Sequence, residues 1–127
     1  MNAFLNVSTI VLRICYVAVL ALGILFWTGN ADNLRDVHML LGIVIVLGLW
    51  ATGVALALRG GSPVLAGALI IYGIIVLYVG LNQEQWLPGT SHWIIQVLHL
   101  LLGLGTMALT ETTRRRIRVG GAAVSRA

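Results

Sequence analysis

Two histidines lie inside otherwise apolar segments of this chain, about sixty residues apart. His38 belongs to the sequence VHMLLG at residues 37–42, and His99 belongs to LHLLLG at residues 98–103. Both sequences read apolar-His-x-Leu-Leu-Gly, which indicates an internal repeat. A polar group in an apolar surrounding costs several kcal/mol unless it is paired or ligated. These two imidazoles are therefore the first candidates for a functional role.

The segments around the histidines are long and apolar enough to cross a membrane. Of the 127 residues, 59% are hydrophobic and 9% are charged, and the mean hydropathy is +0.98. A helix needs about 20 mostly apolar residues to span the hydrocarbon core. Four such helices are predicted in a single transmembrane domain, residues 1–127, and a basic cytoplasmic tail follows them at 113–127. The predicted helices cover about 7–28, 34–58, 63–81 and 91–112.

The predicted fold is an all-α, up-down four-helix bundle in a lipid bilayer, because all three connections are short. Asp32 or Asn33 can cap the second helix, and Ser62 followed by Pro63 can cap the third. Most basic residues fall on the side of the two termini and the Arg59 turn, so the positive-inside rule predicts cytoplasmic termini in the inner (plasma) membrane. The net charge of +4 is thus explained without a nucleic-acid partner.

The two histidine helices belong to two helical hairpins that look like a parallel repeat about an axis along the membrane normal. Measured from the expected helix starts, His38 and His99 lie at depths of roughly 9 and 12 Å. The two histidines are therefore expected to face each other at similar depth from opposite corners of the bundle, near the outer face. Tryptophans are expected at the outer interface, where amphipathic rings are favoured; they are Trp27, Trp86 and Trp93.

Two imidazoles facing each other at one depth can supply both axial ligands of a haem iron. Gly42 and Gly103 follow the histidines by four residues on the same helix face, where a flat macrocycle could approach the backbone. Further polar residues on the outer side could meet the haem propionates; they are Arg35, Gln96 and His92. A copper or zinc site fits less well, because two histidines are a thin ligand set for either ion.

With histidines on the second and fourth helices of a four-helix unit, the chain resembles one half of a heme A synthase. The resemblance implies axial positions for His38 and His99 and one haem b per chain. The catalytic half of that family carries a Glu shortly before the histidine of its second helix, whereas the matching stretch here, residues 33–37, offers only Asp36. The cofactor-binding half is therefore the closer likeness, and small four-helix membrane b-type cytochromes are a more distant one.

The expected function is that of a membrane b-type cytochrome that transfers electrons or handles haem near the outer face, with a redox protein or a quinone as partner. Any catalysis would be that of a haem-dependent oxidoreductase. Two alternatives stay open: a haem-free transporter or channel-like module whose histidines relay protons, and an assembly subunit. A glycine-rich third helix also offers a packing face for a homo-oligomer; its glycines are Gly67, Gly73 and Gly80.

Overall fold

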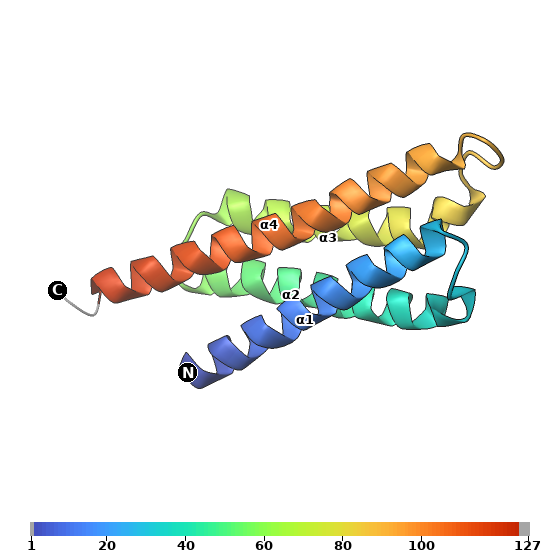
Figure 1. The fold of residues 1–127 in the computed structure, drawn as a ribbon. Helices are drawn as coiled ribbons and strands as arrows, with labels where there is room; N and C mark the ends of the chain where they lie inside the picture. Colours follow the sequence, from blue (N-terminus) through green and yellow to red (C-terminus); the bar gives the residue numbers. More distant parts are fainter. Residues whose placement is uncertain (1, 125–127) are drawn as a thin grey trace.

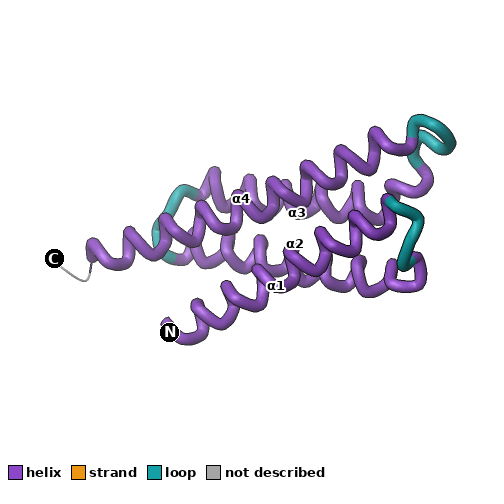
Figure 2. Tube along the Cα trace, in the orientation of Figure 1, coloured by secondary structure: helices purple, strands orange, loops and turns teal. Residues whose placement is uncertain are grey.

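Four helices joined by short connections make up the protein (Figure 1). The computed structural model describes the backbone of residues 2–124 and the side chains of residues 7–120. Two short 3-10 turns, η1 and η2, precede α2 and follow α3. The elements are α1 (Asn2–Trp27), η1 (Asp32–Leu34), α2 (Arg35–Leu58), α3 (Pro63–Asn82), η2 (Gln83–Gln85) and α4 (His92–Val124). Every element described is helical, as predicted (Figure 2).

All four helices are long and apolar enough to span a membrane. The spans run over Val7–Trp27, Asp32–Leu58, Pro63–Gln85 and His92–Gly120, and at most a third of each apolar stretch is buried inside the bundle. Large apolar side chains instead face outward; Val17 is 70% exposed. A soluble domain of this size could not expose so many apolar side chains. Lipid is therefore the natural surrounding of this bundle.

The helices alternate in direction, and α2 lies at the centre of the arrangement. α2 packs most extensively on α3 and also contacts α1 and α4, and its contact with α4 exceeds that between α3 and α4. The two histidine helices therefore touch directly across the short diagonal of a flattened bundle. Both chain ends and the α2–α3 turn lie at one end, called here the terminal end, and the other two connections lie at the loop end (Figure 1).

The connections confirm one predicted cap and correct another. Ser62 caps α3 through its hydroxyl, which accepts a hydrogen bond of 3.3 Å from the backbone N–H of Leu65, with Pro63 in the first turn. By contrast, neither Asp32 nor Asn33 caps α2, whose N-cap position is Leu34 without a side-chain hydrogen bond. The carboxylate of Asp32 binds a guanidinium instead, which offers a stronger, charge-assisted hydrogen bond.

The last helix is longer than the predicted 91–112. α4 continues to Val124, so most of the expected basic tail is helical, and only residues 125–127 lie outside the described residues. Two of its residues explain the extension: Thr113 is 2% exposed, and the guanidinium of Arg114 donates hydrogen bonds to hydroxyls of the neighbouring helices. Interactions inside the bundle thus hold the beginning of the stretch that was predicted as a basic cytoplasmic tail.

Large side chains seated on glycines join neighbouring helices. The indole of Trp50 on α2 lies on Gly73 of α3 and donates a hydrogen bond of 3.1 Å to the carbonyl of Ile70. The hydroxyl of Tyr72 on α3 lies on Gly105 of α4 in the same way, as a donor to the carbonyl of Leu102. Small residues let helices approach closely in lipid, where burial of apolar surface adds little.

Substituting Gly73 by alanine is expected to destabilise the bundle by about 1–3 kcal/mol, the usual cost of overpacking. The added Cβ would contact the ring of Trp50 and lie 3.0 Å from a methyl group of Val46. Gly67→Ala is the matched control on the same helix, because its Cβ would meet nothing within 4 Å. Since alanine is the better helix former, Gly67→Ala should keep or raise the melting temperature in detergent. An equal or higher melting temperature for Gly73→Ala would contradict the packing.

Candidate functional site

His38 and His99 come together at the contact between α2 and α4. Their ring centroids are 6.2 Å apart, and the ring planes are inclined by 50°. Phe26, near the end of α1, approaches the ring of His38 edge-on, with centroids 5.3 Å apart. Both imidazoles are partly buried. The structure therefore places the two histidines as neighbours, although they are about sixty residues apart in the sequence.

Each histidine lies beside a glycine on the helix that precedes its own. A Cβ placed on Gly23 of α1 would lie 3.7 Å from Cε1 of His38. A Cβ placed on Gly80 of α3 would lie 3.0 Å from Cε1 of His99, closer than most real Cβ contacts. The same His–Gly relation thus occurs in both hairpins, and the glycines leave room for the rings.

One nitrogen of each imidazole lacks a partner within the described part of the chain. Nδ1 of His38 and Nδ1 of His99 are both buried, and neither makes a hydrogen bond. Leaving a buried polar atom unsatisfied costs about 1–3 kcal/mol. Such a cost at two adjacent rings marks a place where a ligand, a metal or a shared proton could satisfy the nitrogens.

Within the part of the chain that the structure describes, this place offers two imidazoles as protein ligands. Among the described residues, no cluster of three or more His, Cys, Asp or Glu could hold a metal ion. A zinc site needs three or four protein ligands, so the pair does not suit a bare zinc ion. Two imidazoles that bind one metal ion from opposite sides have ring centroids about 6 Å apart, because each metal–nitrogen bond is about 2 Å long and each centroid lies about 1 Å behind its nitrogen. The observed separation suits a metal that brings its other ligands with it.

Gly42 and Gly103 border open space. A Cβ on either residue would meet nothing within 4 Å. Each glycine follows its histidine by one helical turn and lies on the same helix face. The surface beside the imidazoles is therefore flat on both helices, and a planar molecule would meet backbone there rather than side chains.

The other predicted site residues lie toward the loop end, where they make contacts of their own. The guanidinium of Arg35 is bonded to the carboxylate of Asp32 and to that of Glu84, which ties the first loop to η2. Nδ1 of His92 lies 3.1 Å from the carbonyl oxygen of Trp86. Gln96, in the turn before His99, is partly buried. Arg35 and His92 thus hold the loops together, and only His38 and His99 form the pair.

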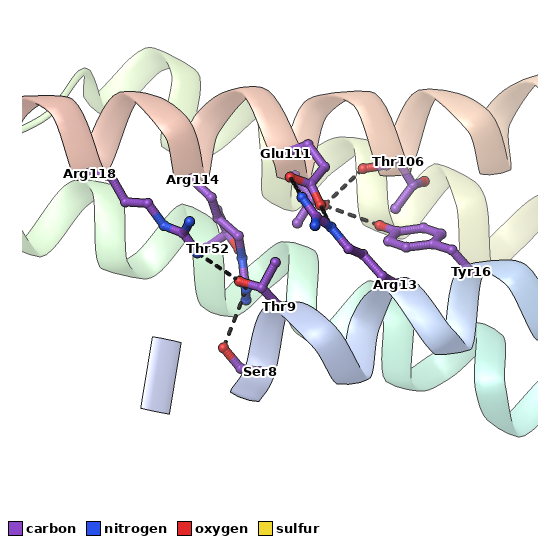
Figure 3. Close-up of polar contacts among 10 residues, drawn as sticks. Ser8, Thr9, Arg13, Tyr16, Thr52, Thr106, Glu111, Arg114 and Arg118 are labelled. Carbon is purple, nitrogen blue, oxygen red and sulfur yellow. Dashed lines mark hydrogen bonds and ion pairs between the residues drawn. The ribbon is translucent and has the colours of Figure 1, made fainter. Parts of the chain in front are cut away.

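A second polar cluster, at the terminal end, was not predicted from the sequence (Figure 3). The guanidinium of Arg13 on α1 binds the carboxylate of Glu111 on α4 through two hydrogen bonds of 2.7 and 3.0 Å. Close by, the hydroxyls of Tyr16 and Thr110 are 3.2 Å apart. Arg13 thus pairs across the interface between α1 and α4.

The sequence does carry a signal for this cluster, namely the spacing of threonines in α4. Thr106, Thr110 and Thr113 are separated by four and three residues, so they share one helix face, and all three are at most 2% exposed. His99 and Gly103 continue that face toward the loop end. One side of α4 is therefore small or polar throughout, from the histidine pair to the arginines.

Comparison with protein-family models, with the curated proteins and with the solved structures gave no match to this chain, so the two polar sites are interpreted from their own geometry.

Proposed function

We propose that this protein is a membrane b-type cytochrome in which His38 and His99 hold one haem b as its two axial ligands. The observation that supports this most is the pair itself: two partly buried imidazoles at 6.2 Å, each with an unsatisfied nitrogen. Haem brings four equatorial nitrogens of its own, so it needs only the two ligands present. Gly42 and Gly103 leave the adjoining surface open for a flat ring.

The donor set favours electron transfer or haem handling over catalysis at the iron. Bound haem supplies one-electron chemistry, and two imidazole ligands leave no open axial position for a substrate. The protein's part is to orient both rings, which Gly23 and Gly80 permit, and to keep water away through the surrounding apolar side chains. The shared His–Gly relation in the two hairpins also supports the parallel repeat and the likeness to the cofactor-binding half of heme A synthases.

The proposal places the haem near the outer face of the inner (plasma) membrane. The tryptophans expected at an interface lie at the loop end, because Trp27 ends α1, Trp86 follows η2 and Trp93 is in the first turn of α4. The arginines near the end of α4 lie at the terminal end. By the positive-inside rule, the terminal end is cytoplasmic. A redox protein or a quinone could then exchange electrons from the outer side or from the bilayer.

The absorption spectrum of the purified protein tests the proposal. Protein expressed with ample haem should be red and show a low-spin Soret band that shifts on reduction. His38→Ala and His99→Ala should each abolish that spectrum, because each removes one of two axial ligands. His92→Ala is the matched control, since its imidazole contacts a loop carbonyl. A colourless wild-type protein under these conditions would refute haem binding.

Gly103→Leu tests the open surface beside the histidines. The leucine side chain would enter the space where the ring is proposed to lie, so haem content should fall at least about tenfold while the protein stays folded. Gly67→Leu, on the open face of α3, should leave haem content unchanged. Haem per protein is measured from the pyridine haemochrome spectrum. Full haem occupancy in Gly103→Leu would show that haem does not lie against this surface.

The threonine face of α4 favours one other function, proton relay without haem. The hydroxyl of Thr110 donates to the carbonyl of Thr106, and the hydroxyl of Thr106 donates to the carbonyl of Leu102. With Tyr16 beside Thr110, these groups form a polar line from the histidine side of α4 to the terminal end. To pass protons toward the imidazole pair, each hydroxyl would turn from its carbonyl to the next oxygen, because a backbone carbonyl accepts a hydrogen bond but has no proton to hand on.

Proton flux into liposomes separates the two functions. If the chain relays protons, the protein will be colourless, and Thr106→Val will lower the flux several-fold. Thr112→Val is the control, because Thr112 is exposed and bonds only its own helix at Ala108. A red protein with no flux excludes the relay. Neither colour nor flux would leave the assembly subunit as the remaining function.

A further inference from the structure

An open hollow at the terminal end is lined mainly by arginines. Its volume is about 430 Å³, and it lies against α1 and α4; its lining residues are Arg13, Glu111, Thr112, Arg114, Arg115 and Arg118. Four arginines and one glutamate give a net of three positive charges, four minus one. This site lies at the other end of the bundle from the histidine pair and is independent of haem.

The positive charge of this hollow is not neutralised within the described part of the chain. The one carboxylate, Glu111, is already bound by Arg13 through two hydrogen bonds. Arg114 donates instead to neutral hydroxyls, at 3.2 Å to Thr52 and 2.8 Å to Thr9. Arg118 likewise donates to Thr9, at 3.1 Å (Figure 3). These contacts hold two guanidiniums in place without supplying a negative charge, so the site suits an anion.

The hollow also lies where phospholipid headgroups are found. About 20 helical residues cross the hydrocarbon core, and counting from Trp93 at the loop end reaches Thr112. The same count back along α1 from Trp27 reaches Ser8. The arginines of α4 therefore fall at the second membrane boundary, and Arg13 lies one to two turns on the lipid side of it. A molecule bound in this hollow would therefore lie between the headgroup region and the acyl chains.

A smaller hollow of about 180 Å³ adjoins the first one at Thr112, which lines both. It lies against α3 and α4. Leu65, Ala108 and Leu109 give it an apolar wall on one side, and Thr113 and Arg116 also line it. A charged hollow beside a wall of apolar side chains suits an amphipathic ligand, because a free inorganic anion would gain nothing from those side chains.

We propose that this terminal-end hollow binds the phosphate of an anionic phospholipid from the adjacent leaflet. Arg114, Arg115 and Arg118 contact the phosphate oxygens, and an acyl chain follows the apolar wall beside Thr112. Arg13 keeps the carboxylate of Glu111 paired, which reduces its repulsion of the phosphate. Basic pockets between transmembrane helices on the cytoplasmic side commonly bind such headgroups. The basic end of α4 is thus a defined lipid site, beyond general attraction to the membrane surface.

Lipid titration of the full-length protein in neutral detergent tests the site. The delipidated protein is titrated with phosphatidylglycerol or phosphatidylcholine, and bound lipid is measured by native mass spectrometry. Phosphatidylglycerol should bind at least about tenfold more tightly, and Arg115→Gln should weaken its binding by about tenfold. Arg115 is chosen because it is exposed and makes no hydrogen bond or ion pair with the described residues. Equal binding of the two lipids would overturn the proposal.

Two further variants distinguish a specific lipid site from nonspecific attraction between anionic lipid and the basic end of the protein. Arg59→Gln removes an exposed charge at the same end but outside the hollow, and it should change phosphatidylglycerol binding by less than about twofold. Glu111→Gln removes the carboxylate and releases Arg13, so it should strengthen binding several-fold. Equal weakening by Arg59→Gln and Arg115→Gln, or weakening by Glu111→Gln, contradicts the site.

Competition with inorganic phosphate distinguishes a lipid from a soluble anion. If the apolar wall takes part, millimolar phosphate should displace little phosphatidylglycerol, and Leu109→Gln should weaken lipid binding without changing phosphate binding. Complete displacement by phosphate at the same concentration as lipid would show a soluble-anion site and overturn the assignment to lipid. Melting temperatures of all variants, measured without lipid, confirm that each is folded.

Discussion

Lipid as the solvent is the constraint on which this structure depends. Because apolar side chains are as well accommodated in hydrocarbon as between helices, association must come from close packing and from internal polar contacts. Trp50 on Gly73 and Tyr72 on Gly105 meet both needs, since each brings a ring onto a glycine and a hydrogen bond onto a neighbouring carbonyl. These contacts hold α3 against α2 and α4, the two helices that carry the histidines.

The histidine pair also consists of rings packed beside glycines of a neighbouring helix, but one nitrogen of each ring has no partner among the described residues. His38 and His99 rest beside Gly23 and Gly80, much as the tryptophan and tyrosine rest on their glycines. The difference is that Nδ1 of each histidine has no hydrogen-bond partner within the described bundle. A packing contact that leaves nitrogens unsatisfied is poorly explained by stability alone, which is why a ligand is proposed at this point and not at the other ring contacts.

Periodicity and hydropathy predicted much of the fold and part of the site. Four apolar runs with short connections predict four antiparallel helices, and the repeated HxxxG pattern predicts that His38 and His99 come together. Other features depend on interactions between distant residues. The end of α4 could not be predicted, because Arg114 stays helical by binding hydroxyls of α1 and α2. For the same reason, the pairing of Arg13 with Glu111 is absent from any local pattern.

Polar contacts join α1 and α4 at only one end of the interface between them. Within the described residues, every hydrogen bond and ion pair between these helices involves residues 8–16 of α1, at the terminal end. Toward Trp27, α1 is held to the bundle through α2 instead. Parting the two helices there would break no polar contact between them. Beside the imidazoles, the distance between α1 and α4 is therefore set by the contacts that each helix makes with α2.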